Sequence, residues 1–181
     1  MSGLHGYLAE KREAVRAHRE AGERGERSPL LHQRATTTVE GRTGVRRIRV
    51  DEFSVAMDSG PGGYSLGPSS QELLLGAVSS CLSHSFLINA AVLEVSLDEI
   101  EVEVTATQDE RAGSPSFEDV PVYPSDVAYV VRITSHADPD DIRILHEAVQ
   151  RSCPLLNLVR AGQPVTGYVD HVRPTAPQAR P

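Results

Sequence analysis

Tryptophan is absent from this chain, and other aromatic residues are few: three Phe and five Tyr in 181 residues. The core must therefore be built mainly from aliphatic side chains. Two cysteines are too few for the disulfide scaffold of a small secreted protein. A chain of this length buries about 70% of its unfolded surface, so it needs neither disulfides nor a metal to fold. These absences predict one globular domain with an aliphatic core.

An excess of basic residues, a long uninterrupted apolar run and a secretion signal are also missing. The net charge of −7 argues against nonspecific nucleic-acid binding. No unbroken apolar run reaches the roughly 18 residues of a membrane span, and residues 1–26 are charged throughout. We therefore expect a cytoplasmic protein that binds neither nucleic acid nor a membrane. In a reducing cytoplasm a cysteine pair is more often redox-active than structural.

Hydrophobic periodicity predicts strands and helices in separate blocks along the chain. Helices are expected over residues 4–23, 70–93 and 139–151, and strands over 35–40, 46–50, 53–57, 100–107, 128–134 and 165–172. Such a segregated order is typical of an α+β domain with a mostly antiparallel sheet. We divide the chain into a surface helix and linker (1–28), the main domain (29–172) and a disordered tail (173–181).

The helix over residues 70–93 is the clearest prediction. Its side chains are apolar on nearly every face, and such helices are buried in a core or an interface. Ser69 or Ser70 can cap its N-terminus. Glu72 then lies in the first turn, where a carboxylate complements the helix dipole.

Both cysteines lie in contexts that suggest chemistry. Cys81 is inside the apolar helix, and Cys153 opens the sequence Cys-Pro-Leu-Leu-Asn directly after the next helix. Two readings stay open: an attacking thiolate with a resolving thiol, or two buried cysteines acting as small hydrophobes. The catalytic reading requires a cation, because apolar surroundings disfavour a thiolate. Arg42, in the glycine-flanked turn 41–44, is the best candidate, although an exposed turn arginine is the commoner fate.

Other recognised motifs are incomplete. His84 follows Cys81 by three residues and could complete half a zinc site, but no second matching pair occurs. We expect His84 and His146 to be hydrogen-bonded histidines of the core. We expect no metal and no bound cofactor. The glycine-rich segment 60–63 lacks the Gly-Lys-Ser/Thr ending of a phosphate-binding loop.

Three stretches carry a family resemblance. They are ATTTVEGRTG (residues 35–44), SSQELLLGAVSSCL (69–82) and RSCPLLN (151–157). Together with the element order they resemble the OsmC/Ohr family of osmotically inducible and organic hydroperoxide resistance proteins. The resemblance covers roughly residues 34–172.

The resemblance implies an OsmC-like fold: an intertwined α+β homodimer with antiparallel sheets around a buried central helix and two sites at the interface. It assigns Cys81 as the peroxidatic thiol, Cys153 as the resolving thiol and Arg42 as the activating cation. Peroxidase members carry a glutamate ten positions before the first cysteine. Gln71 stands there in this chain, and Glu72 is the nearest acid. One residue turns a side chain by about 100° around a helix.

The function implied by the resemblance is reduction of organic or inorganic hydroperoxides. It belongs to antioxidant defence and depends on an external thiol reductant. Two alternatives stay open. A protein of the same fold could bind an apolar small molecule in its interface cavity, with the cysteines only lining it. It could also be a redox sensor or a structural dimer without turnover.

Overall fold

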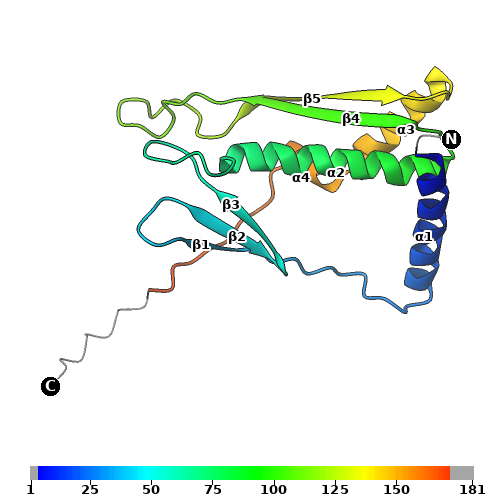
Figure 1. Ribbon diagram of the computed structural model, residues 1–181, viewed down its shortest axis with the longest axis horizontal. Coiled ribbons are helices and arrows are strands. Elements are labelled where there is room, and N and C mark those ends of the chain that lie inside the picture. The colour runs from blue at the N-terminus through cyan, green and yellow to red at the C-terminus, as the bar shows by residue number, and fades with distance from the viewer. Residues whose placement is uncertain (1–3, 172–181) are drawn as a thin grey trace.

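The computed structural model describes residues 4–171 as an α+β fold with one long helix at its centre (Figure 1). The elements follow the chain in the order α1 (His5–Glu23), β1 (Thr36–Val39), β2 (Arg46–Val50), β3 (Phe53–Met57), α2 (Ser70–Leu93), β4 (Glu99–Thr107), β5 (Ser125–Thr134), α3 (Pro139–Ser152) and α4 (Pro154–Arg160). The predicted class is confirmed, and the elements up to α3 form within a few residues of their predicted bounds.

The strands form two separate antiparallel sheets. In the first sheet β2 lies between β1 and β3, with Ile48 opposite both Thr37 and Val55. The second sheet contains β4 and β5, with Val102 opposite Val131. In β4 the inward residues alternate with exposed ones along the whole strand, as expected for a sheet with one face on a core. The sheets lie on opposite sides of α2 in Figure 1.

The C-terminal end differs from prediction in two places. Residues 154–160 form helix α4, because Pro154 occupies its first position, where a missing N–H costs no hydrogen bond. The predicted strand over 165–172 is wrong for residues 165–171, which adopt no regular structure. Val165 and Tyr168 are 92% and 93% exposed. An isolated strand leaves its backbone groups unpaired. Val172 and the predicted tail lie outside the described residues.

The ends of α2 explain its length. The Ser69 hydroxyl accepts a hydrogen bond from the Glu72 N–H at 3.1 Å, and the Glu72 carboxylate accepts one from the Ser69 N–H at 2.7 Å. This reciprocal capping box satisfies two N–H groups that the helix leaves free. The helix ends at Glu94, whose left-handed backbone (φ 60°) stops the helical path. Both predicted ends are confirmed.

The loop before α2 is organised by one buried carboxylate. Asp58 accepts hydrogen bonds from the N–H groups of Tyr64 at 2.6 Å and Leu66 at 3.2 Å, and its side chain is almost fully buried. At Gly67 the loop passes so near β3 that a Cβ would lie 2.2 Å from the Ala56 carbonyl oxygen. Only glycine fits there. The loop thus delivers the chain to the capping site of α2.

Helix α2 is the centre of the core but is covered on only part of its surface. It packs against α1, β4, α3 and α4. Its buried residues are Val78, Leu82, Ser85, Phe86, Ala90 and Ala91. By length and composition alone, α2 could cross a membrane, which the search for unbroken apolar runs did not indicate. Of its most apolar 18-residue segment, 28% is buried in the fold. The mostly buried core helix of a globular protein passes the same test, and α2 packs against four other elements of this fold.

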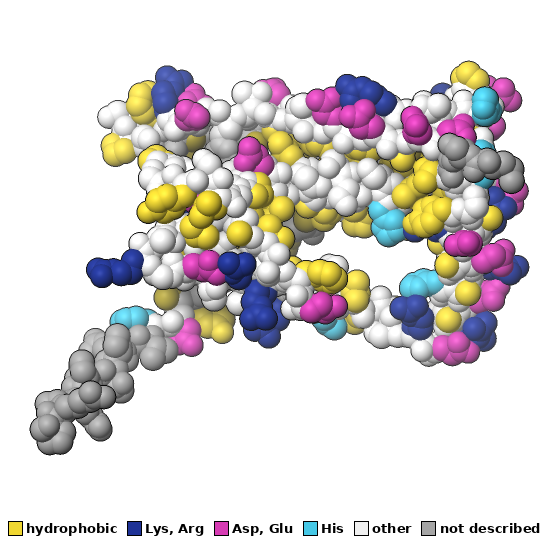
Figure 2. Space-filling model, in the orientation of Figure 1, with side chains coloured by type: hydrophobic (Ala, Val, Ile, Leu, Met, Phe, Trp, Pro, Cys, Tyr) yellow, Lys and Arg dark blue, Asp and Glu magenta, His cyan; other side chains and the backbone are white. Residues whose placement is uncertain are grey.

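Helix α1 docks on α2 through its first half. Leu8 is buried against the core, and Arg12 donates a hydrogen bond from Nε to the Ala91 carbonyl oxygen at 2.7 Å. The second half of α1 and the following linker extend away from this contact (Figure 1). Figure 2 shows an opening bounded by α2, α1, the linker and the β1–β3 sheet. The chain therefore forms an open frame on this side of α2.

Candidate functional site

Two thiols far apart in the sequence meet on α2. The Sγ atoms of Cys81 and Cys153 are 3.6 Å apart, although 72 positions separate the residues. Cys81 lies in the middle of α2, and Cys153 is the junction residue between α3 and α4. Both are free thiols. A disulfide bond is about 2.05 Å long, so a small approach of the two sulfurs would allow one to form.

The two thiols differ in exposure. Cys153 is fully buried, at 0% exposure, whereas Cys81 is partly exposed. Burial raises the pKa of the Cys81 thiol, and the neighbouring Cys153 raises it further. Hydrogen bonds from the Leu155 backbone and the Ser85 side chain lower it, without cancelling the rise. Cys81 is therefore the thiol that a substrate can reach, and it needs a further positive charge to become a reactive thiolate at neutral pH.

Two asparagines fix the position of Cys153. Asn157 donates from Nδ2 to the carbonyl oxygens of Cys153 at 2.8 Å and Gln150 at 3.1 Å, closing the bend between α3 and α4. Asn89 of α2 donates to the Ser152 hydroxyl at 3.0 Å, next to Cys153. Asn157 can be recognised in the sequence by its place in the Cys-Pro-x-x-Asn motif. The sequence carries no such signal for Asn89, whose partner is 63 positions away.

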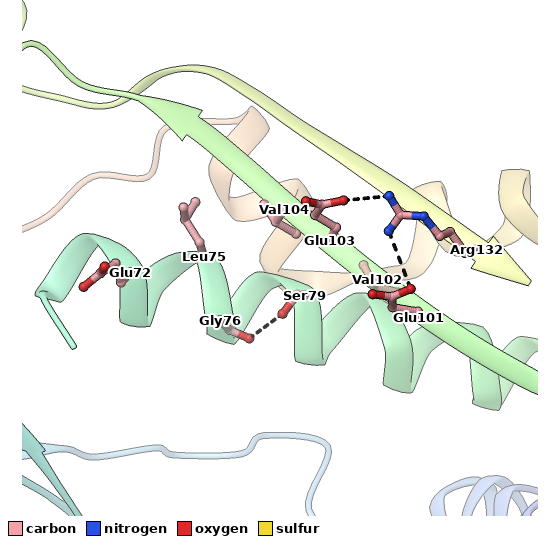
Figure 3. Close-up of a pocket in the computed structure, with 9 residues that line it drawn as sticks. All are labelled: Glu72, Leu75, Gly76, Ser79, Glu101, Val102, Glu103, Val104 and Arg132. Carbon is pink, nitrogen blue, oxygen red and sulfur yellow. Dashed lines mark hydrogen bonds and ion pairs between the residues drawn. The ribbon is translucent and has the colours of Figure 1, made fainter. Parts of the chain in front are cut away.

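Glu72 lies nine residues before Cys81, beside a cavity that neither cysteine lines. It borders an open groove of about 710 Å³ between α2 and β4 (Figure 3). Glu101 and Glu103 of β4 line the same groove and both pair with Arg132, at 3.6 and 2.9 Å. The hydrogen bond from the Ser69 backbone holds the pKa of Glu72 below its ordinary value. Within one chain Glu72 thus caps a helix and carries negative charge beside a carboxylate-rich groove, and it does not contact the cysteines.

Arg42 is exposed in the β1–β2 turn. Among residues 4–171 it forms no ion pair and no side-chain hydrogen bond. Figure 1 shows this turn at the outer end of the β1–β3 sheet, away from the middle of α2. The chain therefore brings together two of its four candidate residues, Cys81 and Cys153, and leaves Arg42 and Glu72 apart from them.

The histidines form no metal site. No group of three or more His, Cys, Asp or Glu side chains suited to a metal occurs within the described part of the chain. His84 is exposed and accepts a hydrogen bond from Lys11 of α1 at 3.2 Å, so the expectation of a core position was wrong for it. His146 is half-buried and hydrogen-bonded to Tyr129 at 2.8 Å, as expected.

A thiol pair held between a long central helix and the junction of two shorter helices, on an α+β scaffold with antiparallel sheets, defines the class of protein. A family model described as OsmC-like protein matches residues 60–167. The chain belongs to this family. The match begins in the loop before α2, so α1 and the β1–β3 sheet lie outside it.

Solved structures share the fold. The chain is similar to an OsmC-like protein from Mycoplasma pneumoniae, with 17% identity, a TM-score of 0.64 and coverage of 73% of this chain and 89% of that one. It is also similar to an organic hydroperoxide resistance protein OsmC from Legionella pneumophila, with 16% identity, a TM-score of 0.53 and coverage of 74% and 92%. A search of curated proteins finds no match.

Proposed function

We propose that this protein is a thiol-dependent peroxidase that reduces hydroperoxides, with Cys81 as the peroxidatic thiol and Cys153 as the resolving thiol. The observation that carries the proposal is the 3.6 Å distance between the two free sulfurs. The difference in exposure supports the order of roles, because only the partly exposed Cys81 offers its sulfur to a substrate. The Legionella protein with the same fold is named for organic hydroperoxide resistance.

The chemistry takes three balanced steps. The Cys81 thiolate attacks the distal oxygen of the hydroperoxide, the O–O bond breaks, and the leaving alkoxide takes a proton from water, so that the products are an alcohol and the Cys81 sulfenic acid. The Cys153 thiol then attacks the Cys81 sulfur, releasing water and forming the disulfide. Finally two equivalents of an external thiol, such as those of a reducing cytoplasm, restore both cysteines and leave as a disulfide.

Activation of Cys81 is assigned in this proposal to Arg42 of a second subunit. Since Arg42 does not meet Cys81 within one chain, its role requires a homodimer in which the β1–β3 sheet of one copy covers α2 of the other. Exposed apolar side chains support such an interface, among them Val39, Phe53 and Leu74. Charge supports the interface as well. The β1–β2 turn with Arg42 is basic and exposed, and the groove beside Glu72, on another part of the chain, is lined by carboxylates.

The test is the intact mass of the reduced protein after one equivalent of cumene hydroperoxide. A loss of two hydrogens, accompanied by loss of both free thiols, is expected. A Cys153→Ser protein should instead gain one oxygen and react with a sulfenic-acid trap. An unchanged mass for the wild-type protein, with both thiols still free, would overturn the peroxidase proposal.

A second candidate is a binding or sensing protein without turnover, and the raised pKa of Cys81 favours it. A protonated thiol is a poor nucleophile. In that case the cysteines react only with strong oxidants, and the protein consumes no hydroperoxide even when an external thiol is supplied. Steady consumption with added dithiothreitol excludes this candidate.

A further inference from the structure

A second cavity lies between β5 and α3, apart from the thiols. It has a volume of about 380 Å³ and no cysteine in its lining. Apolar side chains line much of it: Val131 and Ile133 of β5, Ile142 of α3 and Phe86 of α2. Its volume falls within the range of small-molecule sites, which combine apolar walls with a few polar groups. Pro139 and three side chains with polar groups, Tyr129, Arg143 and His146, complete this lining.

The hydrogen bonds of His146 fix which nitrogen carries its proton. Nε2 lies 3.1 Å from the Gln150 amide nitrogen and 2.8 Å from the Tyr129 hydroxyl. An amide nitrogen only donates, so Nε2 accepts and the neutral ring holds its proton on Nδ1. In the described residues Nδ1–H has no acceptor. The ring is held in place by stacking on Phe86, with centroids 6.1 Å apart, and by an edge contact with Tyr129.

Arg143 supplies a cation beside this donor. Its Nε and Nη1 atoms donate to Asp140 at 3.4 Å and Glu147 at 2.9 Å. Within residues 4–171 its Nη2 atom has no partner. Arg143 and His146 are three positions apart in α3, a spacing that places both on one helix face. Arg143 and His146 thus both line the cavity from α3, and each has an N–H group without a partner among the described residues.

We propose that this cavity binds a small monocarboxylate with an apolar body, such as a short or medium-chain fatty acid. The carboxylate accepts hydrogen bonds from Arg143 Nη2 and His146 Nδ1, since a guanidinium and an N–H donor together match its two oxygens. The apolar body lies against Phe86, Val131 and Ile142, where its burial is favourable. An amine of the same length binds more weakly, because its ammonium group meets the Arg143 guanidinium and the Nδ1–H donor of His146, neither of which accepts a hydrogen bond.

The test is a titration of the full-length, reduced protein with octanoate, followed by calorimetry and by the NMR signals of its histidine rings. Octanoate should bind in a one-to-one complex and shift the ring signals of His146, which a His146→Gln protein identifies by their loss. Octylamine should bind at least tenfold more weakly. Arg143→Met should weaken octanoate binding about tenfold while leaving the fold intact, because Arg143 is exposed.

Arg151→Met is the matched control, since Arg151 is an exposed arginine of the same helix that does not line the cavity. It should bind octanoate as the wild type does. Equal affinity for octanoate and octylamine, or an Arg143→Met protein that binds as tightly as Arg151→Met, would overturn the proposal. Absence of binding at millimolar octanoate, with unshifted His146 signals, would also overturn it. None of these outcomes depends on hydroperoxide reduction at Cys81.

Discussion

The two sides of this molecule differ in how much of their apolar surface one chain buries. We call α2, β4, β5, α3 and α4 the helix half, and β1–β3 with residues 162–171 the strand half. Apart from Leu8 of α1, Val95, Leu97 and the junction residue Cys153, the buried members of the main core cluster come from the helix half. The strand half contributes none and exposes Val39, Phe53 and Tyr168. The main core therefore lies in the helix half, whereas the strand half presents apolar surface that one chain leaves uncovered.

The largest expected effect tests whether the reaction belongs to the helix half alone. Cys81→Ser should abolish catalytic hydroperoxide consumption, a loss of at least about a thousandfold, because no other exposed thiol is present. Cys153→Ser should retain a single turnover and stop as the sulfenic acid. Consumption is followed with a peroxide-specific dye in the presence of dithiothreitol. Undiminished consumption by both variants would remove the chemistry from this half.

The second prediction compares packing in the two halves. Leu82 is fully buried at 0% exposure, so Leu82→Ala should cost about 2–5 kcal/mol of the free energy of unfolding. Val55 is exposed in β3, and Val55→Ala should cost less than about 0.5 kcal/mol in an isolated chain. Urea unfolding at two protein concentrations measures both.

Formation of a homodimer would change the cost of Val55→Ala. If a second copy covers β3, the cost of Val55→Ala should grow with protein concentration, because dimer formation adds to stability by mass action. The Leu82→Ala cost should change little. A sedimentation mass near 19.6 kDa at micromolar concentration would contradict the dimer.

The third prediction tests whether Arg42, in the strand half, affects the reactivity of Cys81 in the helix half. Arg42→Met should slow the reaction of Cys81 with hydroperoxide about tenfold, equal to about 1.4 kcal/mol of barrier, with little change in stability. Burial raises the pKa of Cys81, so its alkylation by iodoacetamide should accelerate as the pH rises through that value. Loss of the Arg42 charge should move this acceleration to still higher pH. Arg49→Met, an exposed arginine of β2, is the control. Identical pH profiles for the Arg42 variant and the wild type would mean that Arg42 does not affect the reactivity of Cys81.

The smallest effect concerns the start of α2. Ser69→Ala removes one hydrogen bond of the capping box and should cost about 1 kcal/mol of the free energy of unfolding. Glu72→Gln keeps an acceptor for the Ser69 N–H and should cost less. Thermal unfolding measures both. A larger effect of Glu72→Gln on the Cys81 reaction than on stability would assign Glu72 a role at the site across the subunit boundary.

Sequence patterns predicted what is local and missed what is long-range. The bounds of α2 follow from the Ser69–Glu72 signature and the apolar run, so they could be read directly. The closeness of Cys81 and Cys153 could not, because it depends on how α3 returns to α2 over 72 positions. Asn89 was missed for the same reason, since its partner Ser152 lies on another helix.

The errors in the strand half have a different cause. Alternation in residues 165–171 is a strand pattern, but a strand also requires a neighbour, and residues 4–171 of one chain supply none beside this segment. Arg42 was placed in a turn correctly, yet the position of that turn relative to α2 is not encoded by its own residues. In the helix half, α4 was not predicted, although Pro154 stands at its first position, where proline is common.

The long separation of the two cysteines also makes unfolding depend on oxidation. A bond between Cys81 and Cys153 would close a loop of 72 positions in the denatured chain. By the loop-entropy relation such a cross-link stabilises the folded state by about 4 kcal/mol. An oxidised molecule should therefore resist proteases and heat better than a reduced one. Each encounter with a peroxide would leave the protein harder to degrade until a thiol reverses it, so its lifetime would follow the oxidant load around it.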